Sequence, residues 1–353
     1  MHAFGRISTA AALTAALSGG CDPGDPRPEE TARGVSADTV LNGVSFNGVS
    51  FNGVSFNGSR LDGVRLEPLQ LANLHLDGHA LSGVSLVGSV LSGTRPGGAA
   101  ASGSALAGAE LPATLSDGTH LTLHLDAVAA SPIDPALSLY TVSTTLPGSA
   151  ARHPLCGLDA AGAPVQAIPL EGSWDESAGT PTGGAHLEDP TVFTFACNGH
   201  ALAKCVELGY APWATVTECR TPGTCHALSL APFHQACTRM LRADYCGDGT
   251  PTTRDGTLVD VWDDEGIQGD EDSAWAFEGE WGEGGATCVM STRWPTVTDA
   301  GESVQTFIHD HCPSRWKTTG CGGSTSAFFT PNGFSTPLTS RPLLRTRITH
   351  PNG

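Results

Sequence analysis

Residues 44–58 read Val-Ser-Phe-Asn-Gly three times in succession, and this stretch decides how the neighbouring sequence is interpreted. The same phase continues beyond it, with glycine two residues after most centres. The central apolar positions are Leu41, Phe46, Phe51, Phe56, Leu61, Leu66, Leu71, Leu76, Leu81, Leu86 and Leu91, and later Leu106 and Leu111. A period of five fits neither a helix nor an alternating strand. It predicts short straight faces joined by tight corners, with the apolar residue pointing inward and glycine at the corner.

Segment 41–111 resembles the pentapeptide-repeat family, whose fold is a right-handed, four-sided β-helix. The resemblance implies a right-handed quadrilateral pentapeptide β-helix over these residues, serving as a rigid spacer or scaffold. Phe46, Phe51 and Phe56 are then expected to form a ladder in its core, and an aromatic ligand-binding stripe is the alternative. Some members of that family mimic duplex DNA, but here an export signal precedes the repeat, which disfavours that role.

The composition is strongly acidic, with 36 acidic and 18 basic side chains and a formal net charge of −18 over 353 residues. Binding to the phosphate backbone of a nucleic acid requires clustered Lys and Arg. We therefore expect no nucleic-acid partner. After residue 20, no apolar run approaches the roughly 20 residues that a membrane-spanning helix requires.

The N-terminal residues 1–20 have the layout of a secretory signal, with Arg6 followed by a small apolar stretch. They lead into Leu-Ser-Gly-Gly-Cys at residues 17–21, which resembles a bacterial lipobox, in which the cysteine is acylated. The alternative is an ordinary secretory signal that is cleaved nearby. Residues 21–40 are rich in Pro, Asp and Glu and are typical of a tether. We expect an exported lipoprotein, anchored in the outer membrane or at the cell surface through an acyl chain on Cys21.

The fold class expected beyond the repeat is mostly β, ending in a disulfide-rich α+β part. Segment 112–189 is a β-rich segment, and a cysteine-rich domain is expected over 190–345. Alternation of apolar and polar residues predicts strands. Two helical candidates follow, and Pro232 suits the first position of the second one. The expected strands are 120–125, 137–142, 167–172 and 191–196, and the expected helices are 199–208 and 232–243.

Ten cysteines remain when Cys21 is set aside for the lipid, and an even number in an exported protein favours disulfides. Up to five bonds are expected, and their connectivity cannot be deduced from spacing. Zinc is the competing interpretation, but the close Cys-x-x-Cys spacing of structural zinc sites is missing from the sequence. The disulfide candidates are Cys156, Cys197, Cys205, Cys219, Cys225, Cys237, Cys246, Cys288, Cys312 and Cys321.

Ala243, Asp244, Tyr245 and Cys246 spell Ala-Asp-Tyr-Cys, and Thr-Arg-Asp-Gly-Thr follows at residues 253–257. With these motifs the chain resembles the ADYC-domain family of bacterial proteins, which is largely myxobacterial. The resemblance covers about residues 190–320. The family has no established biochemical activity, so the resemblance names the domain without explaining it.

One hypothesis for catalysis uses His234 and Cys237, which share one face of the expected helix at a spacing of three residues. A nearby imidazole lowers the pKa of a thiol and makes a thiolate nucleophile, and Asp244 would orient the histidine. The result would be a thiol-dependent, hydrolase-like enzyme. The alternative, which we favour, is that Cys237 is a structural disulfide cysteine.

Hypotheses for metal binding rest on acidic and histidine residues. Asp244, Asp248, Asp255 and Asp260 lie in a strongly acidic stretch, 244–283, and carboxylates are hard ligands suited to calcium. However, their spacing does not match the calcium-binding EF-hand loop, and a solvated acidic surface is the alternative. Two-histidine fragments that could share a strand face are His309 with His311 and His120 with His124, for which surface histidine is the simpler interpretation.

The sequence thus favours an exported, lipid-anchored envelope or surface protein with a structural or binding role and without catalysis. Its expected partners are the membrane, through Cys21, and a protein or glycan bound by the C-terminal domain. No cofactor is expected, unless the domain is a calcium-dependent binding head. The thiol-dependent enzyme that uses Cys237, His234 and Asp244 is the other alternative.

Overall fold

The computed structural model describes nine stretches of the chain, all within one compact unit. They are residues 40–42, 64–145, 151–221, 224–254, 257–271, 274–297, 301–317, 321 and 342–349. The expected signal peptide, Cys21 and the three perfect copies of the repeat therefore lie outside the described residues, and so does the ladder of Phe46, Phe51 and Phe56.

The first part of the fold is an antiparallel sheet of nine strands, in the order β2-β15-β12-β10-β9-β8-β3-β4, with β11 beside β10. Its longest strand, β9, buries Leu121, Leu123 and Leu125 in one core with Tyr140, Phe193 and Phe195. All four strands expected from alternation lie within this sheet and are confirmed. The strands are β2 (Leu69–Gln70), β3 (His75–Leu76), β4 (His79–Ala80), β8 (Glu110–Thr114), β9 (His120–Ala130), β10 (Ser138–Thr145), β11 (Arg152–Pro154), β12 (Ala167–Glu171) and β15 (Val192–Cys197).

A three-stranded antiparallel sheet, β5 (Ser82–Val87), β6 (Val90–Thr94) and β7 (Ala100–Ser102), is fastened to the larger one. The backbone N–H of Leu91 donates to the Tyr140 hydroxyl at 2.9 Å. The backbone N–H of Ser138 donates to the hydroxyl of Ser89 at 2.8 Å. Two short 3-10 helices, η1 (Leu71–Asn73) and η2 (Gly103–Leu106), complete this region.

The β-helix expected over 41–111 is wrong for residues 64–111, because the strands there pair antiparallel and not in successive parallel coils. Leu86, for example, pairs directly with Leu91 across the β5–β6 hairpin. The five-residue period nevertheless marks the interior, since most described central leucines are buried. Glycines at 78, 83, 88, 103 and 108 adopt positive φ at this spacing. The period fixes where the chain buries a residue and where it turns, but strand pairing decides the direction of each turn.

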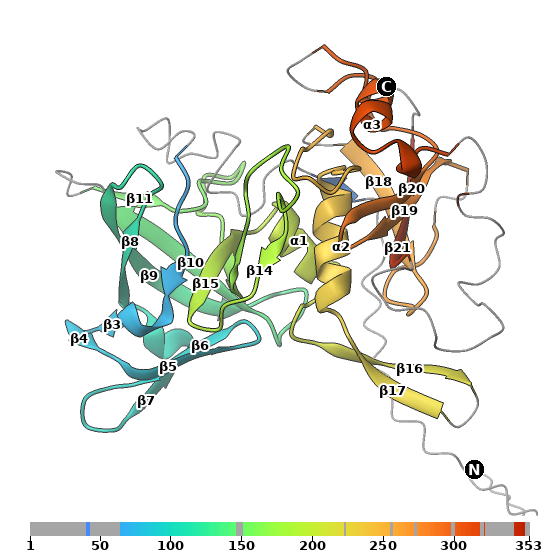
Figure 1. Cartoon of the computed structure of the whole chain (residues 1–353). Coiled ribbons are helices and arrows are strands. Elements are labelled where there is room, and N and C mark those ends of the chain that lie inside the picture. Colours follow the sequence, from blue (N-terminus) through green and yellow to red (C-terminus); the bar gives the residue numbers. More distant parts are fainter. Residues whose placement is uncertain are drawn as a thin grey trace, which may run out of the picture. The chain divides into compact units, whose positions relative to one another are not determined.

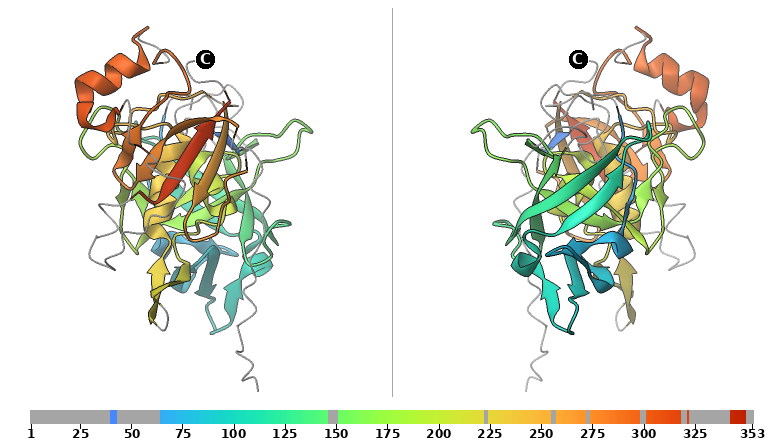
Figure 2. Two further views of the ribbon diagram at one scale, coloured as in Figure 1. Left: turned by 90° about the vertical axis from the view of Figure 1, so that its right-hand side faces the viewer. Right: turned by 90° about the vertical axis from the view of Figure 1, so that its left-hand side faces the viewer.

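The second part of the fold is a five-stranded antiparallel sheet in the order β1-β18-β21-β19-β20. The left view of Figure 2 faces this sheet, with β21 in red among its neighbours. Its first strand comes from the start of the repeat segment, where Leu41 pairs with Leu258. The strands are β1 (Val40–Asn42), β18 (Thr257–Asp263), β19 (Ala276–Gly282), β20 (Gly285–Val289) and β21 (Leu344–Ile348).

Two helices join these sheets, and both were expected from the sequence. Helix α1 (Ala201–Glu207) contacts β15 of the nine-stranded sheet, whereas α2 (Ala231–Leu241) contacts α1 and the strands β19, β20 and β21 (Figure 1). Pro232 lies in the first turn of α2, where its missing N–H costs no hydrogen bond. The boundary expected at residue 190 cuts through the nine-stranded sheet, because β12 and β15 pair across it.

Among the described residues, no helix is long and apolar enough to cross a membrane.

The remaining elements are small. Helix α3 contains His309 and His311, which were expected on a strand. The elements are the two-stranded pairs β13 (Ser173–Trp174) with β14 (His186–Leu187) and β16 (Thr215–Thr221) with β17 (Thr224–Ser229), then α3 (Val304–His311) and the 3-10 helix η3 (Pro313–Arg315).

Candidate functional site

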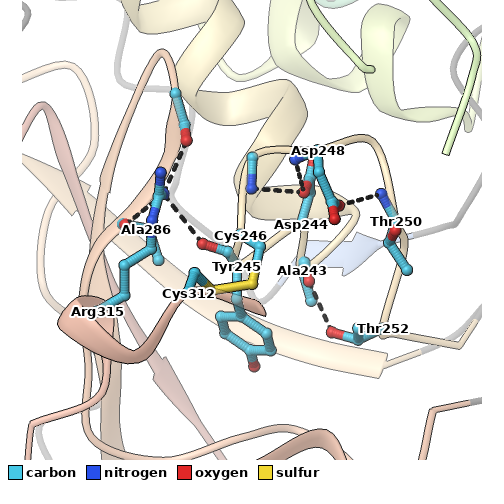
Figure 3. The surroundings of a disulfide bond; sticks show 12 residues. Ala243, Asp244, Tyr245, Cys246, Asp248, Thr250, Thr252, Ala286, Cys312 and Arg315 are labelled. Atoms are coloured by element: carbon cyan, nitrogen blue, oxygen red, sulfur yellow. Dashed lines mark hydrogen bonds between the residues drawn. A yellow bond between two sulfur atoms is a disulfide. The ribbon is translucent and has the colours of Figure 1, made fainter. Parts of the chain in front are cut away.

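The Ala-Asp-Tyr-Cys motif lies where α2 ends and the chain reverses (Figure 3). Ala243 is fully buried with a φ of 50°, a left-handed conformation that L residues rarely adopt. Its backbone N–H donates to the carbonyl of Met240 at 2.9 Å, and the N–H of Asp244 donates to that of Arg239 at 3.0 Å. These bonds satisfy carbonyls at the helix end that have no partner inside the helix. The first motif residue is thus a helix terminator.

The buried carboxylate of Asp244 organises the loop that follows. Its Oδ1 accepts hydrogen bonds from the backbone N–H groups of Gly247 at 2.8 Å and Asp248 at 3.1 Å. Its Oδ2 accepts one from the N–H of Gly249 at 3.0 Å and also pairs with the Arg239 guanidinium. Both oxygens are therefore engaged inside the protein, where burial of an unpaired carboxylate would be costly.

Gly247 and Gly249 let other segments approach the motif loop closely. Both have positive φ, 71° and 85°. A Cβ on Gly247 would overlap the carbonyl oxygen of Gly284, and one on Gly249 would overlap that of Ser177. The turn before β20 and the loop after β13 thus close directly against the motif loop. Glycine is therefore required at both positions by space as well as by backbone conformation.

Tyr245 enters the hydrophobic core between α2 and the five-stranded sheet, which we call the second core, and meets a buried ion pair there. Its hydroxyl donates to Glu278 Oε1 at 2.7 Å, and its ring stacks on Trp281 with centroids 5.3 Å apart. Arg293 binds the same carboxylate through two nitrogens, at 2.6 and 3.0 Å. Burial, and secondarily the Glu278 charge, raise the Tyr245 pKa well above its ordinary value. The phenol therefore stays protonated and remains a hydrogen-bond donor.

Cys246 forms a disulfide with Cys312, which fastens η3 and the end of α3 to the motif. Arg315 of η3 reinforces this attachment (Figure 3). Its Nη1 lies within hydrogen-bond distance of three backbone carbonyl oxygens, those of Gly284 at 2.7 Å, Ala286 at 2.7 Å and Tyr245 at 3.1 Å. All four motif residues therefore serve to connect α2, β19, β20 and η3.

The structure does not assemble the catalytic set that the sequence suggested. Cys237 is bonded to Cys205, so no thiol is available there for a nucleophile, and the thiol-dependent hypothesis is wrong for this residue. His234 is buried, and its Nε2 donates to the carbonyl of Leu202 at 3.1 Å. Burial lowers the pKa of His234 from 6.5 to about 4. Asp244 instead binds Arg239 and the motif loop.

All ten cysteines expected to form disulfides do so, which confirms that expectation. Four of the five bonds close loops of 32–66 residues, and one links residues only six positions apart. The pairs are Cys156–Cys197, Cys205–Cys237, Cys219–Cys225, Cys246–Cys312 and Cys288–Cys321.

The candidate calcium ligands have other environments. Asp244 is engaged as described, Asp248 accepts from the backbone N–H of Thr250 at 2.9 Å, and Asp260 is buried on β18. Asp255 lies outside the described residues. Within the described stretches, no group of three or more His, Cys, Asp or Glu side chains is placed to hold a metal ion.

Of the two histidine pairs, one differs from expectation and the other lies on a strand as expected. His309 and His311 are exposed on helix α3. Helix residues two positions apart lie about 200° apart around the axis, so the prediction that these two histidines share one strand face is wrong. His120 and His124 do lie on one strand, β9, where they contact the hydroxyls of Thr114 and Thr145 respectively.

An ion pair between Arg239 and a carboxylate of the acidic stretch could be anticipated, but sequence reasoning missed the other charged partners of the motif, namely Glu278, Arg293 and Arg315. Arg239 lies on the expected helix, but its pairing with Asp244 depends on how that helix ends. Glu278 and Arg293 are 15 residues apart, and Glu278 is 33 residues from Tyr245. No local spacing signals pairs at such separations. The one sequence signal for these residues is that each charged side chain lies next to apolar or aromatic residues in the chain.

Together, the fold and the motif define a mostly β protein with a C-terminal α+β part, held by several disulfides around a buried structural motif. The model of the ADYC domain matches residues 103–295, and that of pentapeptide repeats matches residues 37–67 with eight copies. The first match covers more than half of the chain, so the chain belongs to the ADYC-domain family. No curated protein sequence and no solved structure matches the chain.

Proposed function

We propose that this protein is an exported, lipid-anchored envelope or surface protein whose ADYC domain has a structural or binding role without catalysis. The main observation behind the proposal is that the polar and sulfur-containing side chains of the motif all bind partners inside the protein. Asp244, Tyr245 and Cys246 are engaged with Arg239, Glu278 and Cys312. A catalytic or ligand-binding motif must instead present groups to a substrate.

The five disulfides support an extracytoplasmic location. Disulfides persist in oxidising compartments and are rare where thiol reductants keep cysteines reduced. The bonds Cys246–Cys312 and Cys288–Cys321 interleave along the chain, so the C-terminal part depends on both. A cytoplasmic location would leave these cysteines reduced, and the second core would lose the loop closures that stabilise it.

The proposed membrane partner is reached through an acyl chain on Cys21, followed by the tether of residues 21–40. The remaining partner would be a protein or a glycan that binds the rigid domain. The acidic composition, with a net charge of −18, disfavours nucleic acid as that partner.

The test is peptide mapping by mass spectrometry on protein taken from its native envelope, with free thiols alkylated before digestion and without reduction. We expect an acylated N-terminal Cys21 and five disulfide-linked peptides. A chain that retains residues 1–20, or one that carries alkylated cysteines throughout in freshly isolated protein, would contradict export. Cys21 with a free α-amino group and no lipid would contradict the anchor alone.

A further inference from the structure

The hairpin of β16 and β17 is a two-stranded sheet of its own, which extends away from the rest of the described chain in Figures 1 and 2. Its register assigns the side chains to two faces. Thr217 pairs with Ala227 and Cys219 with Cys225 on one face, which we call the outer face. Residues 216, 218, 226 and 228 lie on the other, inner face.

The two faces have different surroundings. On the inner face, Val216 and Leu228 pack into the second hydrophobic core, and Glu218 is buried beside His226. On the outer face, Thr217, Cys219, Cys225 and Ala227 are all exposed. The hairpin is therefore held from one side only, and the disulfide lies on the side that faces solvent.

No other described disulfide has both of its cysteines exposed. Six of the remaining eight cysteines are buried, with exposed fractions of at most 7 %, and Cys246 and Cys312 are half-buried. Thiol–disulfide exchange requires a thiolate to reach a sulfur atom, so access controls which bond reacts. The Cys219–Cys225 bond is the one that an external thiolate meets first.

We infer that Cys219–Cys225 is a thiol-exchange site, at which an external dithiol reduces the hairpin. One thiolate of the dithiol attacks a sulfur of this pair, which forms a mixed disulfide and releases the other cysteine as a thiolate. The second thiolate of the donor then displaces the first cysteine. The protein gains two thiols after protonation, and the donor leaves as its own disulfide, so two electrons pass from donor to protein.

The fold is built to tolerate this reduction. The bond links residues six positions apart, and a short loop contributes least to the stability of the folded chain. Cys219 and Cys225 are already partners in the strand register, and the inner-face contacts of Val216 and Leu228 do not involve the sulfur atoms. Reduction changes the outer face from a closed disulfide to two thiols while the core stays packed.

Graded reduction of the oxidised full-length protein tests the inference. Low concentrations of dithiothreitol are applied in the absence of denaturant, new thiols are alkylated at intervals, and each cysteine peptide is quantified. We expect alkylation of Cys219 and Cys225 at least about tenfold faster than that of any other pair, with an unchanged far-ultraviolet circular dichroism spectrum. The half-buried Cys246–Cys312 pair is the internal control.

Glutathione replaces dithiothreitol in a second arm, and an adduct on Cys219 or Cys225 is the expected product. The double variant Cys219→Ser with Cys225→Ser provides a matched protein without the site, in which the fast phase should disappear. Equal rates for Cys219–Cys225 and Cys246–Cys312 would overturn the inference. So would loss of the circular dichroism signal in step with the first alkylation, because reduction would then require unfolding. The test does not depend on the lipid anchor or on the binding role.

Discussion

The hydroxyl of Tyr245 donates to Glu278 Oε1 at 2.7 Å, Arg293 forms an ion pair with the same carboxylate, and all three side chains are buried. The tyrosine of the family motif therefore completes the hydrogen bonding of a charge that has no access to water. Removing a buried charge's partner costs more than the hydrogen bond was worth, because the remaining group is left unsolvated.

Breaking the Glu278–Arg293 pair is expected to be severe. Glu278→Gln or Arg293→Met should lower the free energy of unfolding by about 3–5 kcal/mol, because each leaves its partner buried and uncompensated. Tyr245→Phe should cost less, about 1–3 kcal/mol, since Arg293 still neutralises the carboxylate. Urea unfolding of oxidised protein measures all three. Equal losses for Tyr245→Phe and Arg293→Met would refute this ranking.

Asp244→Asn is expected to destabilise the protein by about 3–5 kcal/mol, because it removes the charge that Arg239 pairs with and turns an NH₂ group toward backbone donors. The matched control is Asp248→Asn, four residues away. Its side chain accepts from the backbone N–H of Thr250, and the asparagine oxygen can still do so. We expect that variant to lose less than about 1 kcal/mol. A comparable loss in both variants would contradict the assignment of the larger cost to the buried Asp244–Arg239 pair.

Gly247→Ala should destabilise the domain far more than Gly78→Ala, although both glycines have nearly the same positive φ, 71° and 75°. Left-handed backbone alone costs alanine about 1–2 kcal/mol, which both variants share. Only at Gly247 does a Cβ also overlap a backbone carbonyl, whereas Gly78 faces open space. Thermal unfolding in parallel should separate the two by at least about 2 kcal/mol. Indistinguishable midpoints would mean that the turn before β20 does not close against the motif.

Stability is expected to fall with acid because of His234. Burial lowers its pKa to about 4, while the unfolded chain titrates near 6.5. Between these values the unfolded state binds the extra proton, so stability rises with pH across that window and levels off above 6.5. The difference amounts to about 3 kcal/mol between pH 6.5 and pH 4.

His234→Gln tests this dependence, since its amide N–H can still donate to the carbonyl of Leu202. Urea unfolding at half-unit steps from pH 4 to pH 7 should give a shallower profile for the variant than for the natural protein. Parallel profiles for the two proteins would exclude His234 as the source.

The sequence was most informative where the signal is local. Alternation located the strands at 120–125 and 191–196, and Pro232 marked the start of α2. The even cysteine count predicted that all ten residues pair, and the tetrapeptide Ala243–Cys246 identified the family. Each of these depends on residues close in the chain or on composition alone.

What could not be predicted depends on distant pairing. The leucine at every fifth position marked the interior of 64–111, but the antiparallel course there is set by partners such as Tyr140, 49 residues from Leu91. The short distance between His234, Cys237 and Asp244 in sequence suggested a site. In the structure, however, they bind Leu202, Cys205 and Arg239 respectively. Chemistry-bearing residues that are neighbours in sequence need not share an environment.

The order of the disulfides has a consequence for proteolysis. Between Cys205 and Cys321, a cut almost anywhere leaves the two fragments covalently joined, because a described disulfide spans the cut. The exception is the stretch 238–245, which lies between the Cys205–Cys237 loop and the Cys246–Cys312 loop. Every residue of that stretch is buried, from the end of α2 to Tyr245 of the motif. The one segment whose cleavage would divide this half of the protein is thus the segment that a protease cannot reach in the folded chain.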